Sequence, residues 1–217
     1  MSGIAPKAAP RGYLSALALR HLWRGAYAPR DSMREALRAR IGEPARLLLL
    51  ALFALALGLL DPDTRALGRA ALENAVDDDS RMRGLLLLAL GAAVIGVGIV
   101  IAYLVAALIA HALSWPAWSR ASFARARSVA ALSAWFSLLP TVVVKGLALA
   151  LLPAAMIAAD PPSLFSAIEI VMLIPFFAAC LMAAFGAGPV RALLVATLIN
   201  GAFYLALVFL YLVSPSP

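Results

Sequence analysis

Two uncharged stretches are too long for a globular core, and they constrain this chain more than any other feature. Residues 84–110 form 27 consecutive positions without a charged side chain, and residues 192–217 form 26 more. A bilayer core about 30 Å thick needs roughly 20 apolar residues of helix to cross it. The sequence therefore predicts an integral membrane protein. Its 13% of charged residues agrees, because soluble domains carry about 25%.

Hydropathy predicts an all-α fold, a polytopic membrane helical bundle with five transmembrane helices behind an amino-terminal amphipathic helix. Residues 1–44 form the cytoplasmic segment and residues 45–213 the transmembrane domain. The expected spans are residues 45–60, 84–113, 129–152, 164–185 and 190–213. A secretory signal is the alternative for the first span, but the 44 residues before it are too many for the basic region of a signal peptide.

The amino-terminal segment has the pattern of a helix that lies on a membrane surface. In residues 13–27, leucines recur on one face beside Arg20 and Arg24, as in interfacial amphipathic helices. Tryptophan gathers at membrane interfaces, and three tryptophans are the expected interfacial anchors: Trp23, Trp115 and Trp118.

A second helix is expected over residues 31–40, where it leads the chain toward the first span. Asp31 or Ser32 is the expected amino-terminal cap, and Glu35 follows Ser32 by three residues. That spacing is the signature of a capping box.

The distribution of basic residues predicts the orientation. Nine Lys and Arg residues precede residue 47, four lie in the first connection, three in the second, none in the third and one in the fourth. The first connection also holds six acidic residues. Cytoplasmic loops carry the excess of Lys and Arg, so the amino terminus is expected in the cytoplasm and the carboxyl terminus in the periplasm of a bacterial inner membrane. Anionic lipid explains the basic amino-terminal segment better than nucleic acid does.

Residues 103–140 carry a resemblance to a known family. Tyr-Leu-Val-Ala-Ala-Leu-Ile-Ala-His-Ala-Leu leads into a Ser-Trp-Pro turn, then Ser-Phe-Ala-Arg-Ala-Arg at 122–127, and then an Ala- and Trp-rich span that reaches Pro140. The arrangement resembles bacterial members of the Yip family, the Rab/Ypt-interacting membrane proteins. The resemblance implies five spans, an external carboxyl terminus and a non-enzymatic role. Trp-Pro replaces the Gly-Gly turn of relatives, and Gly42-Glu43-Pro44 replaces the Asp-Leu-Tyr-Gly-Pro-type stretch of eukaryotic members.

Lys145 and Glu169 are ionisable residues inside the third and fourth expected spans. Lys145 lies 7 residues before residue 152, and Glu169 lies 5 residues after residue 164. At 1.5 Å per residue both are roughly 8–10 Å deep from the same face of the membrane. Ionisable residues in spans are usually paired or functional, so the sequence predicts an intramembrane ion pair. The alternative is that each side chain reaches the outer interface separately.

The sequence predicts neither catalytic residues nor a cofactor or metal site. The chain has one cysteine and two histidines, His21 and His111, without the spacing of a zinc site. A serine protease would require His111 with Ser133 or Ser137, but neither serine lies in a nucleophile turn. Small residues in the second span predict a close helix-packing face: Gly91, Gly96 and Gly98.

The function expected from these features is a non-enzymatic membrane scaffold or adaptor. It would assemble with membrane lipids and with a membrane-protein partner or a second copy of the chain, and not with nucleic acid. The alternative is a small transporter, or a subunit of a transport complex, built around Lys145 and Glu169.

The charge pattern makes a testable prediction about topology. We introduce a cysteine at Ser2 or at Ser80 of a Cys180→Ala protein and add an impermeant thiol reagent to intact cells. Ser80 lies beside the acidic residues of the first connection, so its cysteine should be labelled, whereas the cysteine at Ser2 should react only after the cells are opened. Equal labelling would mean that residues 45–60 do not cross the membrane.

Overall fold

The computed structural model describes residues 23–39, 41–60, 96–97, 99–113, 119–151 and 164–213, and helix is the only regular secondary structure in them. The helices are α2 (Pro29–Arg38), α3 (Glu43–Leu60), α6 (Arg120–Leu151), α8 (Leu164–Phe185) and α9 (Pro189–Val213), with an apolar helix Ile99–Leu113 between α3 and α6. The prediction of an all-α fold is confirmed for this part of the chain.

Three of the described helices are long and apolar enough to cross a membrane: Ala121–Leu151, Ala167–Phe185 and Pro189–Ala206. The helix Ile99–Leu113 is apolar but shorter. Residues 1–22 and 84–95 lie outside the described residues, as do Gly98, Trp115 and Trp118. The five-span arrangement and the surface helix over residues 13–27 therefore stay predictions.

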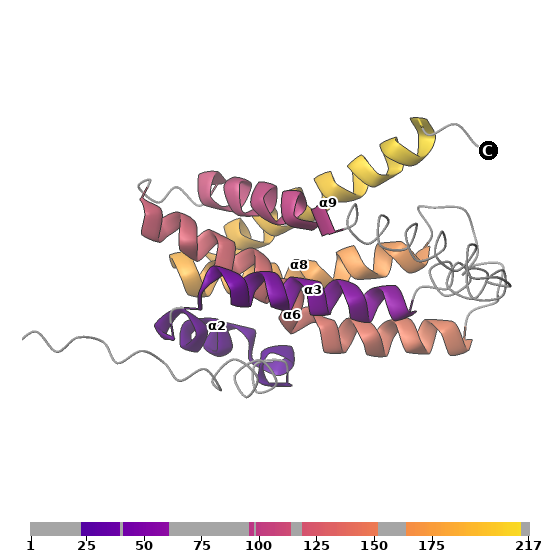
Figure 1. Ribbon diagram of the computed structural model, residues 1–217, viewed down its shortest axis with the longest axis horizontal. Helices are drawn as coiled ribbons and strands as arrows, with labels where there is room; N and C mark the ends of the chain where they lie inside the picture. Colours follow the sequence, from indigo (N-terminus) through magenta and orange to yellow (C-terminus); the bar gives the residue numbers. More distant parts are fainter. Residues whose placement is uncertain are drawn as a thin grey trace, which may run out of the picture.

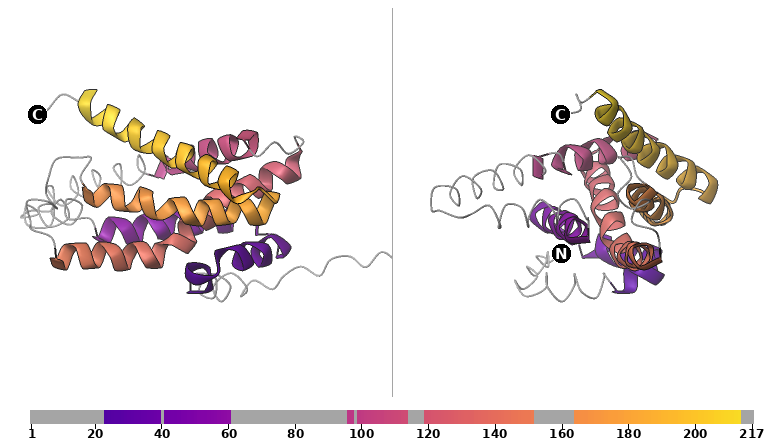
Figure 2. Two further views of the ribbon diagram at one scale, coloured as in Figure 1. Left: turned by 180° about the vertical axis from the view of Figure 1, so that it is seen from behind. Right: turned by 90° about the vertical axis from the view of Figure 1, so that its right-hand side faces the viewer.

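The bundle is assembled around α6 and α8. Figures 1 and 2 show the long helices side by side, with α2 beside one end of the bundle. α6 packs against α2, α3 and α8, and α8 also contacts α2 and α9. Neighbouring helices can approach α6 closely because its buried surface is rich in small side chains: Ala126, Ala130, Ala131 and Ala134.

α6 begins nine residues before the predicted span 129–152, at Arg120. Ser119 and Ser122 cap this end reciprocally. The hydroxyl oxygen of Ser119 accepts the backbone N–H of Ser122 at 3.0 Å, and the hydroxyl oxygen of Ser122 accepts the backbone N–H of Ser119 at 3.0 Å. Such a cap satisfies N–H groups that a helix leaves unpaired at its start, so the helix can extend beyond the apolar segment.

The predicted cap of the second helix is wrong. α2 begins at Pro29, and its N-cap residue, Ala28, makes no side-chain capping bond. Proline lacks a backbone N–H and has a helical φ, so it is favoured in the first turn and starts the helix before the predicted cap. Asp31 instead accepts a hydrogen bond from Arg34 at 3.2 Å, and Ser32 is buried.

The short helical stretch before α2 lies directly on α6. A Cβ built on Gly25 would lie 2.2 Å from Cδ1 of Phe136, whose ring is fully buried. No side chain larger than hydrogen fits there unless the ring or the stretch moves. The absence of a side chain at Gly25 therefore determines how closely this segment approaches the bundle.

We predict that Gly25→Ala destabilises the protein by about 1–3 kcal/mol, the usual cost of overpacking a filled site. Gly201→Ala in α9 is the control, because its added methyl would meet no atom within 4 Å and alanine is the better helix former. Thermal unfolding of the purified protein in detergent measures both. A neutral Gly25→Ala variant would show that the stretch does not dock on α6 in solution.

Candidate functional site

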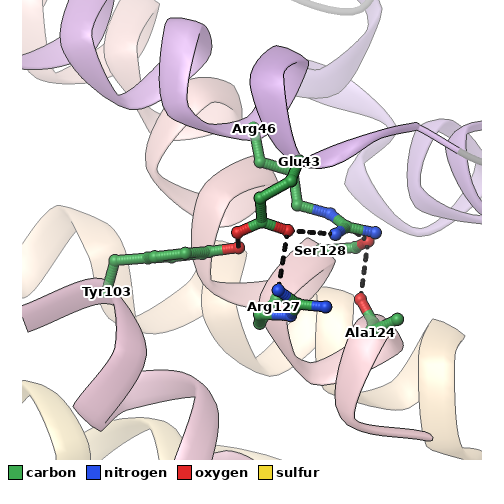
Figure 3. Close-up of polar contacts among 6 residues, drawn as sticks. All are labelled: Glu43, Arg46, Tyr103, Ala124, Arg127 and Ser128. Atoms are coloured by element: carbon green, nitrogen blue, oxygen red, sulfur yellow. Dashed lines mark hydrogen bonds and ion pairs between the residues drawn. The ribbon is translucent and has the colours of Figure 1, made fainter. Parts of the chain in front are cut away.

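Polar side chains from three helices converge on the carboxylate of Glu43, at the start of α3 (Figure 3). Arg46 donates to its Oε2 at 2.6 Å, and Arg127 of α6 forms an ion pair with the same oxygen at 3.0 Å. The hydroxyl of Tyr103, on the helix Ile99–Leu113, donates to Oε1 at 2.7 Å. We call these four residues, together with Ser128, the Glu43 cluster.

Arg46 links the Glu43 cluster to the backbone of α6. Its Nε donates to the Ser128 hydroxyl at 3.0 Å, and that hydroxyl donates to the carbonyl of Ala124 at 3.0 Å. Arg46 is only 7% exposed, and an unpaired charge at such a depth would be very costly. These bonds explain how a guanidinium can be buried at the fourth residue of an apolar helix, α3.

The charges around Glu43 stabilise its ionised form. Burial alone would raise the pKa of this carboxyl, but hydrogen bonds from Tyr103 and Arg46 and the positive charges of Arg127 and Arg46 outweigh burial, so the pKa lies below its ordinary value. Glu43 precedes the predicted span 45–60.

Arg127 also lies over the ring of Phe123, 5.2 Å from its centroid, within the range of cation–π attraction.

The structure brings Lys145 of α6 and Glu169 of α8 together. The ammonium of Lys145 donates to Oε1 of Glu169. Their burial differs, because the Lys145 side chain is 2% exposed and that of Glu169 is 31% exposed. An unpaired buried ammonium is costly, so the carboxylate of Glu169 offsets part of the cost of burying Lys145.

A cavity of about 530 Å³ lies between the helices and includes this ion pair in its wall. α3, the helix Ile99–Leu113, α6, α8 and α9 all contribute to the lining. Apolar side chains make up most of the wall, and the polar ones are Tyr103, Ser133, Lys145, Glu169 and Asn200. Tyr103 thus faces the cavity and also donates to Glu43, so the Glu43 cluster borders one part of the wall.

A second cavity, of about 670 Å³, includes Arg46 and Ser128 in its lining. These two residues belong to the Glu43 cluster, whose Tyr103 lines the first cavity. The Glu43 cluster therefore forms part of the wall of each cavity.

The residues that a serine protease would require have structural contacts. His111 is buried, and its Nε2 lies 2.7 Å from the Ser122 hydroxyl at the start of α6. Ser133 and Ser137 donate to carbonyls of their own helix, at 3.1 Å and 2.9 Å. Neither serine forms the pair with His111 that a serine protease would require. Within the described residues there is no group of His, Cys, Asp and Glu side chains that could hold a metal ion.

Two further predicted positions are exposed. Trp23 is 68% exposed, as an interfacial side chain would be. Gly96 is also exposed, and a methyl group on it would meet no atom within 4 Å, so no described helix of the same chain approaches it closely. Gly91 lies outside the described residues. On the helix Ile99–Leu113 the small residues in the core are alanines, Ala106, Ala107 and Ala110.

No family model, curated protein or solved structure matches this chain. The resemblance to the Yip family therefore stays a prediction, and the function has to be inferred from the two polar clusters and the cavities beside them.

We predict that Glu43→Gln destabilises the protein by about 1.5–3 kcal/mol at pH 7, the usual contribution of hydrogen bonds to a charged group. The pKa of Glu43 is lower in the folded protein than in the unfolded chain. The ionised carboxylate therefore adds its full contribution to the free energy of unfolding above the pKa of the unfolded chain, and this contribution is lost as the pH falls through the pKa of the folded protein. The difference in thermal stability between wild type and variant should therefore shrink between pH 5 and pH 3.

Asp31→Asn is the control, because the ion pair of Asp31 with Arg34 is exposed and such pairs contribute less than about 1 kcal/mol. If the difference between wild type and Glu43→Gln were the same at pH 3 as at pH 7, the carboxylate would not be the stabilising group.

Proposed function

We propose that this chain is a five-span membrane protein that acts as a small transporter or as a subunit of a transport complex. The observation that carries the proposal is the Lys145–Glu169 ion pair in the wall of an interhelical cavity of about 530 Å³. Ion pairs that serve only to join helices need no cavity beside them. Ionisable residues within spans commonly mark a path for a solute or an ion.

The cavity wall favours a small solute with an apolar body and a charged group. Phe53, Phe177 and Phe203 are among its apolar lining residues, and they would contact the body of the solute. A carboxylate on the solute could take the place of Glu169 beside Lys145, and an ammonium could take the place of Lys145 beside Glu169. Such an exchange preserves charge pairing, so it avoids the cost of leaving one charge unpaired in a medium of low dielectric constant.

The two polar clusters suggest how access to the cavity could alternate. The Glu43 cluster borders the cavity through Tyr103, and the Lys145–Glu169 pair lies in another part of the wall. Each is held by charge-assisted hydrogen bonds, which an entering charged group can replace. We propose that opening one cluster at a time exposes the cavity to one side of the membrane and then to the other.

Contacts between helix ends support the alternating five-span arrangement. Arg127, near the start of α6, pairs with Glu43 at the start of α3. Arg191, near the start of α9, donates to the carbonyl of Leu113, where the helix Ile99–Leu113 ends. The starts of α3 and α6 are thus linked to each other, and the end of the helix Ile99–Leu113 contacts the start of α9 through Leu113 and the start of α6 through His111. Alternating spans require this arrangement, in which helices that run one way begin where a helix that runs the other way ends. The charge pattern predicts that this end is cytoplasmic.

The exposed face of α9 supports the alternative, a scaffold for other membrane proteins. α9 packs on α8. Its large apolar side chains that remain at least half exposed are Val190, Leu193, Leu194, Leu198, Leu205 and Phe209. Lipid, a partner helix or a second copy of the chain would cover this face, and oligomeric state in mild detergent distinguishes a bound copy from lipid.

We predict unequal effects of removing the two members of the ion pair. Glu169→Gln leaves the deeply buried ammonium of Lys145 without its carboxylate and should cost roughly 2–5 kcal/mol. Lys145→Met leaves the part-exposed carboxylate of Glu169, which water can reach, and should cost less. The double variant should recover much of the loss. Strictly additive effects on thermal unfolding would contradict coupling between the two residues.

The transport proposal is tested with three probes that share one apolar body: phenylalanine as the zwitterion, phenethylamine as the cation and phenylacetate as the anion. At millimolar concentration at least one should raise the unfolding temperature of the wild type and leave the double variant unaffected, because ligands stabilise the state that binds them. Stabilisation by none of the three, with coupling between Lys145 and Glu169 intact, would favour the scaffold.

A further inference from the structure

The second cavity, of about 670 Å³, has a strongly positive lining. It is enclosed by α2, by the starts of α3 and α6 and by the end of α8. Arg38, Arg46 and Arg125 line it, and none of its described lining residues is acidic. Three guanidinium groups from three helices thus share one space.

Two of these arginines keep their charge available. Arg46 is occupied by Glu43 and Ser128. Arg38 and Arg125 are exposed, and the described part of the chain gives neither of them an ion pair. Glu43, the carboxylate that pairs with Arg46, already accepts from Arg46, Arg127 and Tyr103. The cavity therefore has an excess of positive charge that an anion would offset.

We propose that this cavity binds a phosphate group. Guanidinium groups match the oxygens of phosphate with paired N–H donors, and Arg38 and Arg125 approach the space from α2 and α6. The volume lies within the usual range of small-molecule sites, about 300–1,000 Å³. Apolar lining residues such as Leu37 and Ile41 would contact the carbon portion of a phosphate ester.

The position of the cavity allows two sources of phosphate. It lies beside α2, at the end of the bundle that the charge pattern predicts to be cytoplasmic. Anionic phospholipid headgroups collect basic residues at that surface, and soluble phosphate esters are present in the same compartment. Both carry the chemistry that the arginines recognise, and the experiment has one arm for each.

The test uses the full-length protein purified in detergent and three probes: phosphatidylglycerol, phosphatidylcholine and inorganic phosphate. Binding of the lipids is measured by native mass spectrometry, and binding of inorganic phosphate by the shift in thermal unfolding as its concentration rises. The variants are Arg38→Gln, Arg125→Gln and the two together. Arg34→Gln is the matched control, because Arg34 is an exposed arginine on the same helix that does not line the cavity.

We expect the affinity for phosphatidylglycerol to fall about fivefold for each arginine removed and about 25-fold for both, and the control to change less than twofold. Both side chains are exposed, so the double variant should unfold at the wild-type temperature without probe. This rules out misfolding as the cause of weaker binding.

The outcomes separate the sources. Binding of phosphatidylglycerol without binding of inorganic phosphate identifies a lipid headgroup as the occupant. Binding of both, weakened together in the double variant, identifies the phosphate group itself. The proposal is overturned if phosphatidylcholine binds as tightly as phosphatidylglycerol, if Arg34→Gln weakens binding as much as the double variant, or if neither phosphatidylglycerol nor inorganic phosphate binds.

Discussion

The carboxylate of Glu43 fixes the relative positions of three helices that apolar surface alone would leave poorly determined. In a membrane no hydrophobic effect drives one apolar helix against another, so polar contacts and small side chains determine the packing. Glu43 accepts from Arg46 on its own helix, from Tyr103 on the helix Ile99–Leu113 and from Arg127 on α6. A shift of any of these helices by one turn, about 5.4 Å, would break at least one contact and leave a buried charge or hydroxyl unsatisfied.

α6 is held by polar contacts at two positions along its length. Arg127 pairs with Glu43 and Lys145 pairs with Glu169, and 18 residues of helix separate these two cations. At 1.5 Å per residue they are roughly 27 Å apart along the axis, close to the thickness of a bilayer core, about 30 Å. In the predicted arrangement the two cations would lie toward opposite faces of the apolar layer, Arg127 before the span 129–152 and Lys145 within it.

The sequence predicts what depends on local composition and fails where distant residues meet. The all-helical fold and the apolar helices follow from long uncharged stretches. The ion pair of Lys145 and Glu169 is predictable because both residues flank one short connection, so their depths in the membrane can be compared from residue numbers alone. The Glu43 cluster was not predicted, since Tyr103 and Ser128 lie 60 and 82 residues from their partners Glu43 and Arg46. An available signal was the charged pair Glu43 and Arg46 at i and i+3, where an apolar helix begins.

Helix ends were predicted less well for a related reason. Arg125 and Arg127 made residues 120–128 resemble a polar connection, yet Ser119 and Ser122 cap a helix that runs through them. The charges are compatible with the bundle because Arg125 lines the second cavity and Arg127 pairs with Glu43. Hydropathy identifies where a helix enters the apolar layer, whereas hydrogen bonding at its ends determines where the helix begins.

The two cavities differ in charge, and this difference limits what each of them could hold. Lys145 and Glu169 make the first cavity neutral as a pair, whereas three arginines make the lining of the second positive. A cation would be repelled from the second cavity, and a multiply charged anion would be poorly solvated in the largely apolar first cavity. A zwitterion or a monoanion with an apolar body would avoid both the repulsion in the second cavity and the poor solvation in the first. An anion beside Arg46 would also compete with Glu43 for that guanidinium, so occupancy of the second cavity would weaken the Glu43 cluster.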